Sequence, residues 1–342
     1  MKKILCVLLS VLILFSVVGW ANPSDTKDVP EELPSTAINL LSDEYYRNGF
    51  LLCGRKVSYL DCGFTDYDGE IDQSSYSWRL CQWYTRLTLG NNGNDGEDFD
   101  INFEKDGKNY VYYNDAKKVE INPTDGVISL GVNAGFEYNY QERPSAPEWV
   151  HLLMTCASAY SKKYYLKDLK HVWAYIDFSI DYEKIYNVNA SKFGQDAQVS
   201  QLVWYLQLHS GQYAYSKMRD RVEEVVSWFG IPLYDTRFNK ASWIAGETFT
   251  SDPGTDLALY NIPADEYMTE YPKPDGKRHR YVVCLDDFAV YCFKNLIKTG
   301  WFPENSSFDD AYFHFSNIGW EVPGTIDCKA TIYGMGVYVD EK

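Results

Sequence analysis

The sequence predicts an all-β fold: a two-sheet antiparallel β-sandwich with one short helix near residues 287–299. Apolar and polar side chains alternate in many short segments, and a period of two is the pattern of a strand with one buried face. Glycine, asparagine, aspartate and proline separate these segments, as they do at turns. Many short strands with few helices favour two packed antiparallel sheets.

Two of the predicted strands can be divided into faces, because successive side chains of a strand point to opposite sides of its sheet. In residues 171–180 the apolar face consists of Val172, Ala174, Ile176, Phe178 and Ile180. In residues 198–210 it consists of Leu202, Trp204, Leu206 and Leu208. Both apolar faces are therefore predicted to lie in the core.

The opposite faces of the same two segments mix aromatic and polar side chains, whereas an ordinary solvated face would carry Lys, Glu and Thr. The first segment presents Trp173, Tyr175 and Asp177, and the second presents Gln201, Tyr205, Gln207 and His209. If the two strands are neighbours, these residues form one surface on which sugar rings stack and hydroxyl groups meet amides and carboxylates. The alternative is a face that a loop or the helix covers.

The predicted helix follows from residues 286–300. Asp286 or Asp287 has the position of an N-cap, and Gly300 has the position of the residue that ends the helix. Its apolar stripe is Phe288, Tyr291, Leu296 and Ile297. We expect this helix to cover part of the sandwich and to have a structural role.

The N-terminal residues predict export. Met1, Lys2 and Lys3 precede an apolar run, and small residues follow it at Gly19 and Ala21, which is the pattern of a signal peptide over residues 1–21. Residues 22–36 are acidic and rich in proline and predict a linker, and residues 37–342 predict a single β-sandwich domain. We expect a secreted or cell-surface protein that is not inserted in a membrane after cleavage.

The composition favours a neutral ligand. With 32 basic and 48 acidic residues the net charge is -16, which repels nucleic acid. Aromatic residues make up 16% of the chain, with 29 Tyr and 10 Trp, and these side chains suit wet interfaces and sugar rings. We therefore expect a monomer whose partner is a polysaccharide or an oligosaccharide.

Cysteines and histidines predict neither a disulfide framework nor a metal or cofactor site. Removal of Cys6 with the signal peptide leaves an odd number of cysteines, of which Cys81, Cys284, Cys292 and Cys328 lie in apolar runs typical of buried thiols. Cys53 and Cys62 could close a small loop in an oxidising medium. No paired histidine spacing is present, and the acidic segment 91–107 fits an exposed hairpin loop better than a calcium loop.

Glu321 is the candidate catalytic acid. It stands between Trp320 and a Val-Pro-Gly turn, and a carboxyl group held against an apolar wall keeps its proton, as a general acid must. The alternative is a turn residue that points into water.

The order of segments resembles the concanavalin-type jelly roll of glycoside hydrolase family 12, the secreted endoglucanases and xyloglucanases. The helix at 286–300, the strand AYFHFSNI, the turn GWEVPG and a closing strand follow the family's order. By this resemblance Glu321 matches the acid/base glutamate, and Asp177 in AYIDFS matches an aspartate beside the nucleophile. The segment SQLVWY matches the nucleophile strand, but Gln201 stands where the family has glutamate.

The resemblance implies a glycoside hydrolase acting on β-linked polysaccharide, with Glu321 as general acid and Asp177 as the partner carboxylate. An amide cannot attack a sugar, so Gln201 favours either an inverting reaction or glycan binding without turnover. A secreted structural sandwich is a third alternative. Asp235 and Arg237, at the end of WFGIPLYDTR, are expected to form an ordinary surface ion pair.

Overall fold

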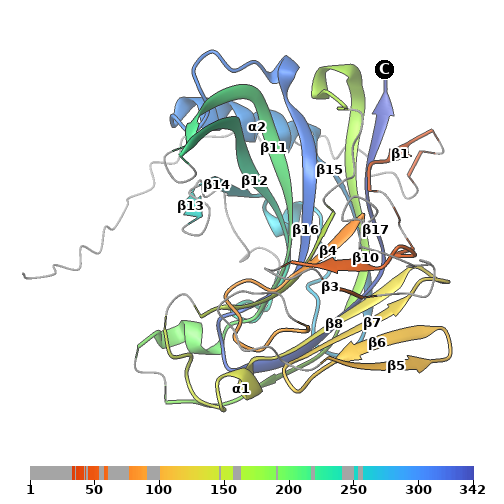
Figure 1. Cartoon of the computed structure of the whole chain (residues 1–342). Helices are drawn as coiled ribbons and strands as arrows, with labels where there is room; N and C mark the ends of the chain where they lie inside the picture. Colours follow the sequence, from red (N-terminus) through yellow and green to blue (C-terminus); the bar gives the residue numbers. More distant parts are fainter. Residues whose placement is uncertain are drawn as a thin grey trace, which may run out of the picture.

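The protein is described here by a computed structural model of the 342-residue chain (Figure 1). The described residues are 33–34, 36–41, 43, 45–53, 58–60, 77–90, 101–145, 148–156, 163–189, 192–216, 220–240, 250–252 and 257–342. The predicted signal peptide, most of the linker, Cys62 and residues 91–100 lie outside them. Within the described ranges, no helix has the length and apolarity that a membrane crossing requires.

The fold is the predicted β-sandwich, and its first sheet has eight strands among the described residues. Along the sheet they are β15 (Arg278–Cys284), β10 (Leu169–Ile185), β17 (Ile326–Glu341), β8 (Val127–Asn133), β7 (Lys117–Asn122), β6 (Asn109–Tyr113) and β5 (Asn102–Asp106). The eighth, β1 (Ile38–Asn39), pairs with β17. All of these pairs are antiparallel.

The second sheet has nine strands in the described part of the chain. Their order is β13 (Thr250–Asp252), β14 (Leu257–Asn261), β12 (Arg221–Asp235), β11 (Gln201–Ser216), β16 (Tyr312–Val322), β9 (Val150–Cys156), β4 (Trp78–Cys81), β2 (Phe50–Leu52) and β3 (Ser58–Leu60). Two of its pairs, β12 with β14 and β2 with β4, are parallel. In Figure 1 the long strands β11 and β12 bend together through this sheet.

The core between the sheets confirms the predicted apolar faces. Side chains from Val172 to Ile180 on β10 and from Leu202 to Leu208 on β11 belong to one buried cluster. Trp320 on β16 crosses this core, because its Nε1 donates to the carbonyl of Leu130 on β8, in the other sheet, at 3.0 Å. Burial of these apolar faces leaves the alternate residues of each strand on the outside of the sandwich.

The described residues between 38 and 133 contribute strands to both sheets. Strands β2, β3 and β4 extend one side of the nine-stranded sheet, and β5 to β8 form the far part of the eight-stranded sheet. In Figure 1 the hairpins of β5 to β8 lie together at the lower right. The face of the nine-stranded sheet is therefore wider than the C-terminal strands alone would make it.

Helix α2 (Asp286–Lys298) was predicted within one residue at each end, but its predicted cap is wrong. The N-cap residue is Leu285, and it makes no side-chain capping bond. Asp286 instead accepts hydrogen bonds from the backbone N–H of Val172 and from His171, both at 2.8 Å. Gly300, with φ of 80°, ends the helix as predicted. The other α-helix within the described residues is the single turn α1 (Ala134–Glu137).

A buried ion pair connects α1 with β7. Lys117 Nζ lies 2.9 Å from Glu137 Oε2, and the two side chains are 0% and 1% exposed. Thr85 donates to the same carboxylate, and the Lys117 ammonium also contacts the Thr85 hydroxyl. Burial lowers the pKa of Lys117, and the charge of Glu137 opposes this shift. Every charge in the cluster has a partner, so loss of one partner leaves the other charge buried.

Lys117→Met should therefore lower the free energy of unfolding by about 3–5 kcal/mol, because the Glu137 carboxylate stays buried without its cation. Lys108→Met is the matched control. Lys108 pairs with Asp125 at 3.3 Å, but these side chains are 60% and 51% exposed. Its loss should cost less than about 1 kcal/mol. Urea unfolding followed by circular dichroism measures both values, and equal losses would contradict this account.

Candidate functional site

The predicted surface shared by two strands does not form, because β10 and β11 belong to different sheets. Strand β10 pairs with β15 and β17, whereas β11 pairs with β12 and β16. Trp173 and Tyr175 lie on the outer face of the eight-stranded sheet, and Tyr205 lies on the outer face of the nine-stranded sheet. The prediction that they form one surface is wrong, since the core lies between the two faces.

The predicted pairing of Asp177 with Glu321 is wrong for the same reason. Asp177 lies on β10 and binds Arg278 of β15 through two contacts, from Nε to Oδ1 at 2.5 Å and from Nη2 to Oδ2 at 2.7 Å. Its side chain is 7% exposed. Arg278 also lies 4.3 Å above the ring of Tyr333. Asp177 is a structural ion-pair residue of the eight-stranded sheet.

Glu321, Gln201 and Asp235 form a row on the outer face of the nine-stranded sheet. Gln201 on β11 is in register with Glu321 on β16 and with Asp235 on β12. Their neighbours Leu202 and Trp320 are buried in the core, so the row points outward. The sequence argument expected Asp177 to be the carboxylate that shares a face with Glu321. In the structure Asp235 has that position.

Asp235 is held in place by two neighbours. Gln201 Nε2 donates to Asp235 Oδ2 at 2.7 Å, and Arg237 contacts the same oxygen through Nη2 at 2.6 Å. The backbone N–H of Arg237 also donates to Oδ1 at 2.9 Å. The predicted pair of Asp235 and Arg237 is confirmed, but Asp235 is only 5% exposed, so this is not an ordinary surface pair. The amide of Gln201 and the guanidinium of Arg237 together fix the position of this carboxyl group.

Glu321 does not lie against Trp320, which corrects the predicted reason for a retained proton. The two residues are adjacent on one strand and point to opposite faces. Glu321 Oε1 instead lies 3.9 Å from His151 Nε2. His151 Nδ1 lies 3.0 Å from the carbonyl of Trp83, to which it can only donate. The Nε2 of a neutral His151 is therefore an acceptor that faces Glu321.

A pocket of about 210 Å³ lies beside Gln201 and Asp235. Its walls include Tyr205, Arg237 and Asn261. Gly230 permits this arrangement, because a Cβ there would lie 1.8 Å from Asn261 Oδ1 and 2.7 Å from the Tyr205 ring. Tyr205 also contacts Trp228, with ring centroids 6.1 Å apart. The pocket combines an aromatic wall with polar groups.

Two buried amide oxygens near Tyr205 on this face have no hydrogen-bond donor among the described residues. They are Oδ1 of Asn261, at the pocket, and Oδ1 of Asn317. Asn317 is 4% exposed and is in register with Tyr205 on the neighbouring strand. A buried carbonyl without a donor is costly. Water or a ligand hydroxyl can supply the missing hydrogen bond.

The other end of the same face carries His209, which was predicted to bind substrate. His209 Nδ1 lies 3.3 Å from Glu224 Oε2, and the hydroxyl of Tyr312 donates to the same oxygen at 2.7 Å. Burial would raise the pKa of Glu224, but these two contacts and the charge of Lys163 lower it to about 2. Gln207 lies between the two ends, in register with Trp228. Polar groups therefore flank an aromatic middle.

Cys53 Sγ lies 2.9 Å from Cys81 Sγ. Cys62 lies outside the described residues, so a loop closed by Cys53 and Cys62 stays a prediction. Cys81, Cys292 and Cys328 are buried as predicted, whereas Cys284 is half-buried. The pair of Cys53 and Cys81 packs with Trp83 and Tyr205 in a small cluster outside the main core.

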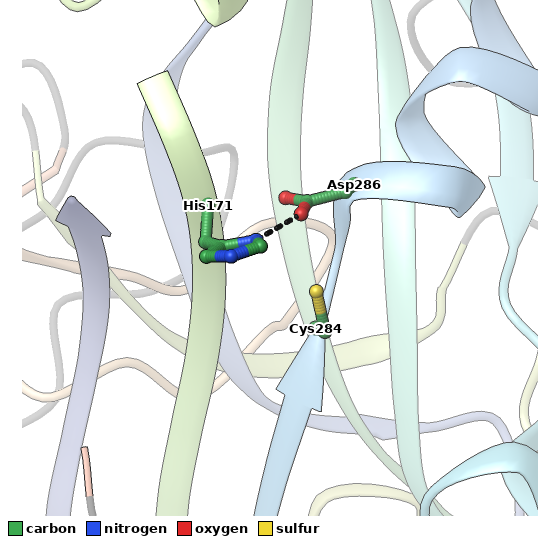
Figure 2. A group of neighbouring side chains, drawn as sticks. All are labelled: His171, Cys284 and Asp286. Carbon is green, nitrogen blue, oxygen red and sulfur yellow. Dashed lines mark hydrogen bonds and ion pairs between the residues drawn. The ribbon is translucent and has the colours of Figure 1, made fainter. Parts of the chain in front are cut away.

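One group of side chains has the donor set of a metal site. His171 on β10, Cys284 at the end of β15 and Asp286 at the start of α2 each offer one donor atom, and these atoms all lie within 4.8 Å of one another. Figure 2 shows the three side chains, with His171 directed at Asp286 and the sulfur of Cys284 below them. The sequence argument missed this group because His171 lies over 110 positions before Cys284 and Asp286, and only the pairing of β10 with β15 brings them together.

Several groups of the outer face also escaped the sequence argument. His151, Asn261 and Asn317 come from β9, β14 and β16, and no local motif marks them. Glycine at position 230 was one usable signal, since glycine inside a strand indicates a close approach by another group. The other groups could be found only from the pairing of the strands, and the order of the segments in the sequence does not reveal that pairing.

No family model and no curated protein matches the chain. Among solved structures, a native family 12 xyloglucanase from Bacillus licheniformis is 13% identical, covering 70% of this chain and 97% of its own at a TM-score of 0.38. The endoglucanase cel12A from Rhodothermus marinus is 11% identical, with 71% and 97% coverage and a TM-score of 0.34. At such identities and TM-scores nothing about the chemistry of this chain follows from the likeness.

Proposed function

We propose that the outer face of the nine-stranded sheet binds a β-linked polysaccharide. The observation that carries the proposal is the set of polar groups around one aromatic pocket: Glu321, Gln201 and Asp235 in a row, beside Tyr205 and Asn261. Polysaccharide chains present hydroxyl groups at their edges and C–H groups on their ring faces. A face of this composition offers partners for both.

The unpaired acceptors support a ligand rich in hydroxyl groups. Asn261 Oδ1 and Asn317 Oδ1 are buried without donors, and a sugar hydroxyl can donate to such a carbonyl. The length of the face supports a chain rather than a single sugar. Gln201 and His209 lie eight residues apart on β11, which is about 26 Å along a strand.

Tyr205→Ala should weaken binding of soluble xyloglucan or mixed-linkage β-glucan at least tenfold, because the aromatic wall of the pocket is lost. Tyr175→Ala is the matched control, since Tyr175 lies on the outer face of the other sheet. Isothermal titration calorimetry and affinity gel electrophoresis measure the effect. No binding by the unmodified protein, or an equal loss in the Tyr175 variant, would contradict the proposal.

Hydrolysis with inversion is the second candidate, and the positions of Glu321 and Asp235 favour it. They lie on one face with one strand between them, so their backbones are about 10 Å apart. Inverting glycosidases separate the two carboxyl groups by about 6.5–9.5 Å, whereas retaining enzymes need about 5–5.5 Å. Gln201 occupies the middle position and cannot act as a nucleophile.

In this candidate Glu321 donates a proton to the leaving oxygen, and Asp235 accepts a proton from water. His151 Nε2, at 3.9 Å, lies close enough to return a proton to Glu321 after a small movement, once this nitrogen has itself taken a proton from water. Asp235 must first release the amide of Gln201, which occupies one of its oxygens. Hydrolysis therefore requires Asp235 to break its hydrogen bond with Gln201. Binding alone does not require this, because the contacts of Asp235 with Gln201 and Arg237 can stay in place.

If the second candidate is correct, Glu321→Gln and Asp235→Asn should each lower the release of reducing ends from β-glucan at least 100-fold, the size of a general acid–base contribution. Asp125→Asn is the control, because Asp125 is an exposed carboxylate near the β7–β8 turn. Turnover that persists in both site variants would exclude these roles. If the unmodified protein binds β-glucan but releases no reducing ends, hydrolysis is excluded and only the binding proposal stands.

A further inference from the structure

Two side-chain clusters lie outside the argument for glycan binding, and each contains cysteine. The first is the pair of Cys53 and Cys81. Strands β2 and β4 run parallel with Leu52 opposite Leu80, so the next residue on each strand is a cysteine. The backbone N–H of Cys53 donates to the carbonyl of Leu80 at 3.0 Å, which continues the ladder to this position. Both sulfur atoms therefore lie on one face of the sheet.

We propose that Cys53 and Cys81 form a disulfide bond in the exported protein. Neighbouring strands lie about 4.8 Å apart, which is within the range of Cα separations that a disulfide spans. The two sulfur atoms are 2.9 Å apart, so the bond needs little movement of either strand. The bond would connect the outermost strands β2 and β3 to β4, beside the face that we assign to the glycan.

The chemical environment supports reaction at Cys53. The hydrogen bond from Cys81 lowers the pKa of Cys53, burial opposes the shift, and the charge of Arg79 adds to it. Cys53 is half-buried, whereas Cys81 is buried, so an oxidant reaches Cys53 first. Thiolate is the reactive form of cysteine.

A low-molecular-weight disulfide such as oxidised glutathione is a sufficient oxidant. The Cys53 thiolate attacks one sulfur of that disulfide, and one glutathione thiolate leaves. The Cys81 thiolate then attacks the Cys53 sulfur of the mixed disulfide, and the second glutathione leaves. The two cysteines lose two protons and two electrons, and the glutathione disulfide is reduced to two thiols.

Peptide mass spectrometry without reduction, after incubation with oxidised glutathione at pH 8, should show a peptide that joins residues 53 and 81. The closed loop has 28 positions, so the melting temperature should rise by roughly 5 °C over that of the reduced protein. Cys62→Ser should keep both effects, and Cys81→Ser should lose both. Recovery of Cys53 as a thiol, or a Cys53–Cys62 link in the unmodified protein, would overturn the proposal.

The second cluster is His171, Cys284 and Asp286, on the outer face of the other sheet (Figure 2). His171 Nδ1 and Asp286 Oδ2 are 2.8 Å apart, so they must separate by about 0.5 Å to reach the ~3.3 Å between two such ligands on one tetrahedral zinc ion. The second oxygen of Asp286 accepts from the backbone N–H of Val172 at 2.8 Å, which fixes the carboxylate in the way that outer hydrogen bonds orient metal ligands.

From this geometry we infer that the cluster binds a zinc-like divalent cation. Nitrogen, thiolate and carboxylate are the ligand types of zinc. A tetrahedral ion would place Cys284 Sγ about 3.5 Å from His171 Nδ1. The two atoms now lie within 4.8 Å of each other, so they must approach by at most about 1.3 Å. His171 and Asp286 are 38% and 24% exposed, so water can occupy the fourth position.

Cobalt(II) added to the reduced full chain should bind one equivalent and give a thiolate-to-cobalt charge-transfer band with the visible bands of a tetrahedral ion. Zinc should remove this spectrum. Cys284→Ser should abolish the charge-transfer band, and Asp286→Asn should weaken cobalt binding at least tenfold. Cys53→Ser is the control for the other sulfur pair and should leave the spectrum unchanged. No band, or a band that persists in the Cys284 variant, would overturn the inference.

Discussion

The register between β11 and β16 is the constraint on which the outer face of the nine-stranded sheet depends. Leu202 is opposite Trp320, and both are buried in the core. A slip of β16 by one residue would bury Glu321 and expose the indole of Trp320, so the core fixes the register strongly. The hydrogen bond from Trp320 Nε1 to the carbonyl of Leu130, on the other sheet, further stabilises this register. The row of Glu321, Gln201 and Asp235 is a consequence of this burial.

Alternation along a strand was sufficient to predict the class of fold and the buried faces, but not the site. The apolar residues of β10 and β11 were assigned to the core correctly because a period of two is a local property. Whether two strands share a sheet is a property of pairing across the chain. Strand β10 pairs with β17, more than 140 positions away, so the placement of Asp177 beside Gln201 could not be tested from the sequence.

The same alternation could have corrected one expectation without a structure. Trp320 and Glu321 are adjacent on a strand, so they cannot share a face unless the strand ends between them. The sequence argument placed a turn there, but β16 continues to Val322. His151 therefore takes the place next to Glu321 that the indole was expected to have. The boundary of one strand decided the chemical environment of the candidate acid.

Gln201 changes what the row of polar groups can do. A carboxylate at position 201 would stand between Glu321 and Asp235 and repel both, since all three are on neighbouring strands. The amide instead donates to Asp235, and Arg237 neutralises the same carboxylate. Glu321, the other carboxylate of the row, lies 3.9 Å from His151 Nε2. In the function that we propose, this row binds a glycan by hydrogen bonds at little electrostatic cost, and it would accelerate a reaction only if Asp235 released Gln201 and Arg237.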